Sequence, residues 1–163
     1  MSAGEFNANA FESDKFTDRT RDIQVPALAD YFKDGDAVFT VRGLTFDERI
    51  KCESLQSEAQ AKAAEALAKL ALGQVDKTVV NDIQAAMGWG DATQPATRVC
   101  IEKVVTGLVK PKLNRSVVGK ISRVYPVVFN DLLEAIYKLT GQGQQIESKK
   151  SRPSGATKAS EPA

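Results

Sequence analysis

Apolar residues recur at helical spacing along most of the chain, and this pattern predicts a mainly α-helical protein. It is clearest in residues 125–141, where one apolar stripe consists of Phe129, Leu132, Leu133, Ile136 and Leu139. Pro126 suits the first turn of a helix, and Gly141 predicts a left-handed residue at its end. We expect this stripe to pack against the helix predicted over residues 95–109.

Helix start and stop signals place further helices over residues 44–73, 76–88 and 114–124. Thr45 and Glu48 form a capping-box pattern, and Gly73 follows the last apolar position of that segment. Asp76 and Asn114 are candidate N-caps for the two other helices. A short helical turn begins at Pro26.

The only strand pattern is "AVFTVRG", residues 37–43, where side chains alternate between two faces. A single strand does not form a sheet, so it needs a partner from the N-terminal arm, another copy or a binding protein.

The two ends have no continuous hydrophobic pattern. We therefore predict a flexible arm over residues 1–24, a helical domain over 25–143 and a disordered basic tail over 144–163. The arm carries Phe6, Phe11 and Phe16, which we interpret as docking residues. The predicted fold class is mainly α, a compact helical bundle with one short N-terminal β-strand and disordered termini.

Charge is distributed unevenly. Residues 1–109 carry 12 Lys and Arg against 17 Asp and Glu, whereas residues 110–163 carry 10 against 4. The excess of +6 in the second part indicates an acidic partner or a solvated face with a basic tail. The first part has the opposite excess, −5, so the whole chain has a net charge of only +1.

The residue inventory argues against catalysis. The chain has no histidine, which removes the commonest general base and the commonest metal ligand. Cys52 and Cys100 are far apart, and we interpret both as small apolar residues in a reducing cytoplasm. Asp47 and Glu48 suit the first turn of a helix better than a catalytic pair. We therefore expect no enzyme activity, no cofactor, no metal and, because no run of ~18 apolar residues exists, no membrane span.

Two surfaces are candidates for binding. The first is the alanine-rich face of residues 44–73, formed by Leu55, Ala59, Ala63, Ala66, Leu67 and Leu70. Alanine allows a partner helix to lie close, so this face is either a client groove, a contact inside the bundle or a site of self-association. The second is a basic patch formed by Lys110, Lys112, Arg115, Lys120 and Arg123. Because Tyr125 is the only stacking aromatic beside this patch, nucleic-acid binding is the weaker interpretation.

Two segments resemble the tail assembly chaperones of long-tailed phages. "FTVRGLTFDERIK", residues 39–51, resembles the family's "V-R-G-L-T-x-x-E" opening. "VKPKLNRSVVGKISRVYPVVFNDLLEAIYKLTGQG", residues 109–143, resembles its "V-x-P-K-L" element and its "P-x-x-F-x-x-L-x-x-x-I-x-x-L-T-G-x-G" close. The matching positions in the second segment are Val109, Pro111, Lys112, Leu113, Pro126, Phe129, Leu132, Ile136, Leu139, Thr140, Gly141 and Gly143. "VPALADYF", residues 25–32, also resembles the segment that precedes the strand in this family. The similarity therefore spans roughly residues 25–143, and residues 52–108 match only in helical character.

This resemblance implies a non-enzymatic assembly factor. Family members bind the long, aggregation-prone tape measure protein, keep it soluble and help to recruit tail tube subunits around it. The implied location is the host bacterial cytoplasm, with no chaperone in the finished particle, and many members also exist as a longer frameshifted form. The alternative is a small helical protein that binds nucleic acid or builds a particle through its basic C-terminal portion.

Overall fold

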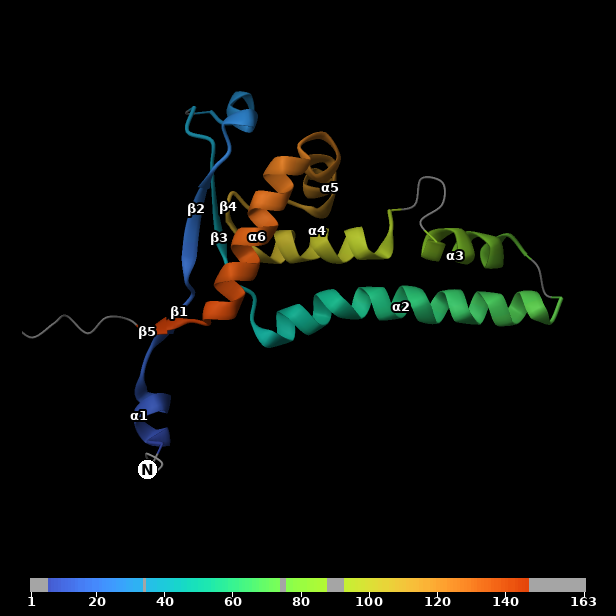
Figure 1. Ribbon diagram of the computed structural model, residues 1–163, viewed down its shortest axis with the longest axis horizontal. Coiled ribbons are helices and arrows are strands. Elements are labelled where there is room, and N and C mark those ends of the chain that lie inside the picture. The colour runs from blue at the N-terminus through green and yellow to red at the C-terminus, as the bar shows by residue number, and fades with distance from the viewer. Residues whose placement is uncertain (1–5, 34, 74–75, 88–92, 147–163) are drawn as a thin grey trace, which may run out of the picture.

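Helices make up most of the structure, a computed structural model that describes residues 6–33, 35–73, 76–87 and 93–146 (Figure 1). The long helices are α2 (Phe46–Ala71), α3 (Lys77–Met87), α4 (Pro95–Gly107), α5 (Arg115–Val124) and α6 (Pro126–Gln142). Shorter helical segments are α1 (Ala8–Ser13) and the 3-10 helix η1 (Pro26–Tyr31). The predicted mainly α class is confirmed.

A three-stranded antiparallel sheet replaces the single strand expected from the sequence. Its order is β2 (Thr20–Gln24), β3 (Val38–Arg42) and β4 (Leu108–Lys110). β2 pairs with β3 along its whole length, from Thr20 opposite Arg42 to Gln24 opposite Val38. The partner strand therefore comes from the segment that the sequence analysis assigned to a flexible arm.

Strand β4 also changes the boundary of a predicted helix. The apolar pattern predicted a helix over residues 95–109, but α4 ends at Gly107 and β4 begins at Leu108. The apolar spacing continues past Gly107, yet Leu108 is buried opposite Val41 of β3. Pairing with β3 gives these residues the backbone hydrogen bonds that a longer α4 would have formed within the helix.

The main core lies between this sheet and α6. It contains buried side chains from β3, β4, α4, α5, α6 and η1, among them Phe39, Leu108, Leu132 and Ile136. Helix α6 packs on β3 and β2, and its apolar stripe also faces α4. A Cβ on Gly107 would lie 2.6 Å from the Cδ1 atom of Ile136, so α4 and α6 approach closely at this point. The apolar stripe of α6 therefore packs against α4, as the sequence predicted.

Helices α2, α3 and α4 extend to one side of this core (Figure 1). Helix α2 packs along both α3 and α4. Lys103 of α4 joins them to α6, because its Nζ lies 3.4 Å from an oxygen of Glu53 and 3.3 Å from the hydroxyl of Tyr137. Ala66 and Val79 are buried outside the main core, in the layer between α2 and α3.

The predicted caps at the starts of three helices are confirmed, whereas residue 88, the predicted end of the second helix, lies outside the described residues. The capping box of Thr45 and Glu48 forms, and the side chains of Asp76 and Asn114 accept hydrogen bonds from Val79 N and Val117 N. The predicted end of the last helix is wrong: α6 continues through Gly141 to Gln142, and Gly143 takes the positive φ of 65°.

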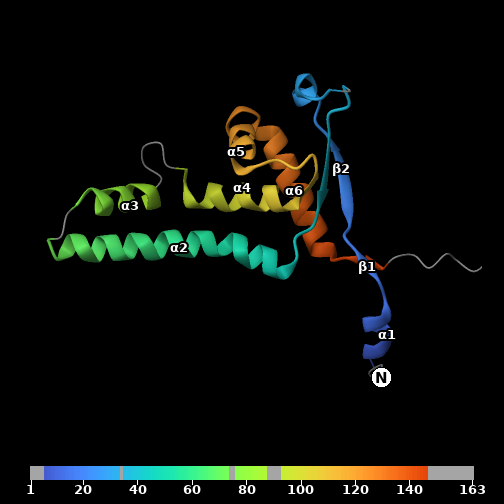
Figure 2. The ribbon, with the colours of Figure 1, turned by 180° about the vertical axis from the view of Figure 1, so that it is seen from behind.

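Two short strands, β1 (Phe16–Thr17) and β5 (Gln145–Ile146), form a second antiparallel pairing. In β1 and β5, Phe16 lies opposite Ile146 and Thr17 opposite Gln145. The rest of the predicted disordered tail, residues 147–163, lies outside the described residues. Viewed from behind, α1 projects from this pairing away from the body of the protein (Figure 2).

Candidate protein-binding groove

A largely apolar groove of about 510 Å³ lies between η1 and α5, and we call it the η1–α5 groove. Its lining residues are Leu28, Tyr31, Phe32, Lys33, Phe39, Pro111, Leu113, Val117, Lys120, Ile121, Val124 and Tyr125. Apolar and aromatic side chains with a few polar groups are the usual lining of a binding site.

Local sequence explains how the wall at η1 is held. Pro26 starts the 3-10 turn, and Val25 N donates to the carbonyl of Ala37 at 2.8 Å. Leu28 is buried in the main core, and the Phe32 ring meets Phe39 edge-on with centroids 5.7 Å apart. These anchors fix the turn while Tyr31 remains exposed at the edge of the groove.

The opposite wall is the outer face of α5. Asn114 caps this helix, and Val118 and Ile121 turn into the core. Val117 and Val124, seven residues apart and therefore on one face, remain exposed. An exposed, contiguous apolar surface of this kind is typical of an interaction site.

The groove has polar groups at its rim. Lys33 and Lys120 both line it, and no carboxylate does among the described residues. At one end, the side chain of Tyr31 hydrogen-bonds that of Tyr125, which raises the pKa of Tyr125 above its ordinary value. The groove therefore offers apolar walls, two cationic side chains and two phenol groups.

The alanine-rich face of α2 lies elsewhere. Ala66 is 2% exposed, Leu55, Ala59 and Ala63 are half-buried, and Leu67 and Leu70 are exposed. Leu55 lines a small hollow with Ile101 of α4, and α3 packs along the same helix. Most of this face is thus occupied by the chain's own helices, and only its edge at Leu67 and Leu70 is open.

The five basic residues do not form one free patch. Arg115 makes two hydrogen bonds to Glu102, at 2.5 and 2.8 Å, and Lys112 Nζ donates to the carbonyl of Leu108. Arg123 donates to the carbonyl of Gly119 within α5. Lys120 lines the η1–α5 groove, whereas Arg115 and Arg123 line the hollow beside α4. Lys110 is exposed at the end of β4.

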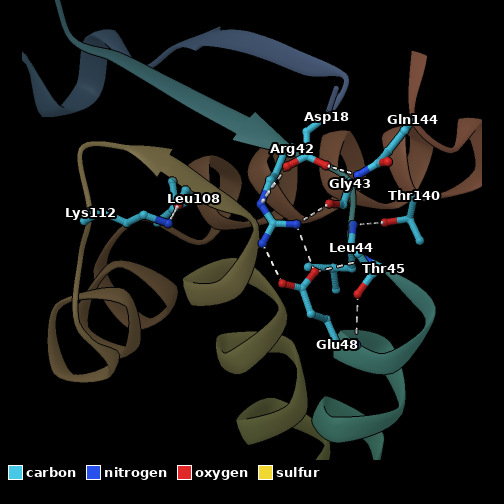
Figure 3. Close-up of polar contacts among 10 residues, drawn as sticks. All are labelled: Asp18, Arg42, Gly43, Leu44, Thr45, Glu48, Leu108, Lys112, Thr140 and Gln144. Atoms are coloured by element: carbon cyan, nitrogen blue, oxygen red, sulfur yellow. Dashed lines mark hydrogen bonds and ion pairs between the residues drawn. The ribbon is translucent and has the colours of Figure 1, made fainter. Parts of the chain in front are cut away.

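The two segments that carry the sequence resemblance meet in space (Figure 3). Leu44 N donates to the hydroxyl of Thr140 at 2.9 Å, and that hydroxyl donates to the carbonyl of Ile136. A Cβ on Gly43 would lie 2.7 Å from the backbone of Leu139 and Thr140. The "RGLT" and "LTGQG" residues therefore form one packing contact between β3, the start of α2 and the end of α6.

Arg42 organises the polar side of that contact. Its guanidinium donates to both carboxylate oxygens of Glu48, at 2.6 and 2.9 Å, and to the carbonyl of Gly43 (Figure 3). Asp18 lies 3.7 Å from Arg42 and accepts from Gln144. The hydrogen bond from Arg42 lowers the pKa of Glu48 from its ordinary 4.5 to about 2.

In the described part of the chain, His, Cys, Asp and Glu form no group of three suited to a metal ion. Cys52 and Cys100 are both free, and burial raises the pKa of the Cys52 thiol. Within the same residues, no helix has the length and apolar character needed to cross a bilayer.

Comparisons with protein-family models, curated proteins and solved structures give no match for this chain. Its function is therefore inferred from its own residues.

The η1–α5 groove was not predicted from the sequence. Its walls come from segments about 90 residues apart, and their proximity depends on the β2–β3–β4 sheet. One local signal was present: Val117 and Val124 share one apolar face of the predicted helix, which lies beside the face of the core residues Val118 and Ile121. A second apolar face on a short helix predicts an additional contact.

Proposed function

We propose that this chain is a phage tail assembly chaperone that binds the tape measure protein, keeps it soluble and helps to recruit tail tube subunits. Two independent observations support this proposal. The sequence resemblance covers residues 39–51 and 109–143, and these segments pack together as one structural unit. The η1–α5 groove gives such a protein a place to hold an apolar client segment.

The groove is the observation that carries the proposal. A tape measure protein is long and aggregation-prone, so a chaperone must cover its apolar side chains. Helix-in-groove recognition does this by inserting an i, i+3, i+4, i+7 stripe between host elements. The walls at Tyr31, Val117 and Val124 supply apolar area, while Lys33 and Lys120 suit a client segment with acidic flanks.

The proposed setting is the host bacterial cytoplasm, with the chaperone absent from the mature virion. The proposed role needs no catalysis, cofactor or metal.

Co-expression with the tape measure protein of the same phage tests the proposal. We expect the client to be soluble and to co-purify with the wild-type chain. Val117→Glu should abolish this effect, because it places a charge on the groove wall. Val127→Glu is the matched control: Val127 is 71% exposed against 42% for Val117, and it does not line the groove.

An insoluble client with the wild-type chain would contradict the proposal, and equal loss with both variants would place the site elsewhere. A salt titration against DNA checks the alternative. Steeply salt-dependent binding with no effect on the client would favour the nucleic-acid-binding interpretation.

A further inference from the structure

The N-terminal arm carries an unusual exposed aromatic cluster. Phe6 is 73% exposed and Phe11 is 54% exposed, although both belong to an aromatic row with Phe16. The ring centroids of Phe6 and Phe11 are 5.7 Å apart, and those of Phe11 and Phe16 are 5.0 Å apart. The three rings, which we call the Phe arm, therefore present one apolar surface to water.

The Phe arm cannot reach the groove of its own chain. In both ribbon views α1 projects at one end of the molecule, whereas η1 and α5 lie at the other (Figures 1 and 2). The C-terminal end of the arm is held in place, because Phe16–Thr17 pairs with β5 and Thr20–Gln24 pairs with β3. Only a second copy can bring a groove to this arm.

The two surfaces are complementary in chemistry. The groove is lined by aromatic and aliphatic side chains and has Lys33 and Lys120 at its rim. The Phe arm offers three aromatic rings, and residues 6–16 carry Glu12 and Asp14 against Lys15, a net charge of −1. Aromatic anchors seated in a pocket, with opposite charges at the rim, are the usual core of a specific protein contact.

We propose that the Phe arm of one copy docks in the η1–α5 groove of a second copy. Reciprocal exchange closes a dimer, whereas one-way docking builds an open row of copies, since the arm and the groove are different surfaces. If the proposed function holds, a client segment displaces the arm from the same groove, so self-association covers the groove until the client arrives.

Sedimentation of purified full-length chains without a client tests the docking alone. Wild-type protein should associate with rising concentration. The double variant Phe6→Ser, Phe11→Ser should weaken association at least about tenfold, and so should Val117→Glu. Val127→Glu should associate like wild type, and circular dichroism should show that all four chains fold alike.

Mixing gives the decisive result. The arm variant keeps an intact groove and the Val117→Glu variant keeps an intact arm, so a mixture of the two should form a 1:1 complex. A wild-type chain that stays monomeric would overturn the docking, as would an arm variant that still associates or a mixture that does not. None of these results depends on client binding, so this inference and the proposed function can fail separately.

Discussion

Arg42 joins the end of β3 to the start of α2 and to Asp18, which lies far from both in sequence. Its guanidinium holds Glu48 at the start of α2, Asp18 after β1 and the Gly43 carbonyl beside α6. The bidentate pair with Glu48 is mostly shielded from water, and the same carboxylate accepts from Thr45 N in the capping box. The Glu48 carboxylate thus caps α2 and, through Arg42, holds β3 against the start of that helix.

Removing the charge of Glu48 should destabilise the fold in a pH-dependent way. The folded pKa of about 2 lies below the ordinary 4.5, so this pair stabilises the fold above pH 4.5 and loses that contribution as pH falls toward 2. Glu48→Gln should cost on the order of 1–2 kcal/mol at pH 7 after solvent screening. Gln retains the capping-box geometry, so the charge is the main change.

Urea unfolding of the wild-type and Glu48→Gln proteins at several pH values measures this effect. We expect the difference in unfolding free energy to shrink between pH 4.5 and pH 2. A difference that stays constant over this range would show that the Arg42 pair contributes nothing.

Gly43 is required by close packing, not by its backbone angles. Gly43→Ala should destabilise the protein by at least ~2 kcal/mol, because the new Cβ would meet backbone atoms of α6 at 2.7 Å and the backbone cannot move aside cheaply. Gly141→Ala is the matched control. No atom lies within 4 Å of its Cβ position, and a helical alanine should stabilise by roughly 0.5–1 kcal/mol.

Thermal melts of both glycine variants check this pair. A Gly43→Ala protein as stable as wild type would mean that β3 and α6 are not in contact as described.

Among the elements, β2 covers one edge of β3. Its Ile23 packs against the main core, and it leaves β3 as the central strand. Removing residues 1–13 should leave the unfolding free energy nearly unchanged, because no residue of α1 is buried. Removing residues 1–24 should lower it by at least ~2 kcal/mol, since β3 loses its pairing with β2 and the core loses the apolar cover of Ile23.

Equal stability of the two truncated proteins, measured by chemical denaturation, would show that β2 is dispensable. Residues 16–24 would then belong to the flexible arm that the sequence predicted.

The inner face of α2 provides a test of the packing between α2 and α3. Ala66→Glu should destabilise the α2–α3 pair by at least ~2 kcal/mol, because it buries an unpaired charge. Ala64→Glu, on an exposed position two residues away, should change stability by less than ~0.5 kcal/mol. Hydrogen exchange of α3 amides reports the difference. If α3 remains protected in Ala66→Glu, this face is open and is again a candidate client groove.

The sequence predicted elements whose signals are local. The caps at Thr45, Asp76 and Asn114 lie within three residues of their partners, so the pattern alone identified them. Strand β2 was missed because "TRDIQ" has a single large apolar residue and forms a strand only through its pairing with β3. Helix α6 continues past Gly141 because a glycine in the last turn does not itself end a helix, and Gly143 provides the positive φ.

At the scale of the whole molecule, the distribution of exposed apolar surface was the least predictable feature. The periodicity of α2 identified a real apolar face, but it did not show that α3 and α4 cover most of it. The η1–α5 groove needs residues 28–39 and 111–125 to be adjacent, and no local pattern encodes that proximity. The exposed phenylalanines of the arm were visible in the sequence, whereas the groove that complements them was not.

Hydrogen exchange of the full chain, with and without the tape measure protein, tests whether the client binds in the η1–α5 groove. We expect the client to slow exchange in η1 and α5, with little change in the α2–α3 pair. Protection confined to α2 and α3, or no protection anywhere in the described residues, would contradict a client site in the η1–α5 groove.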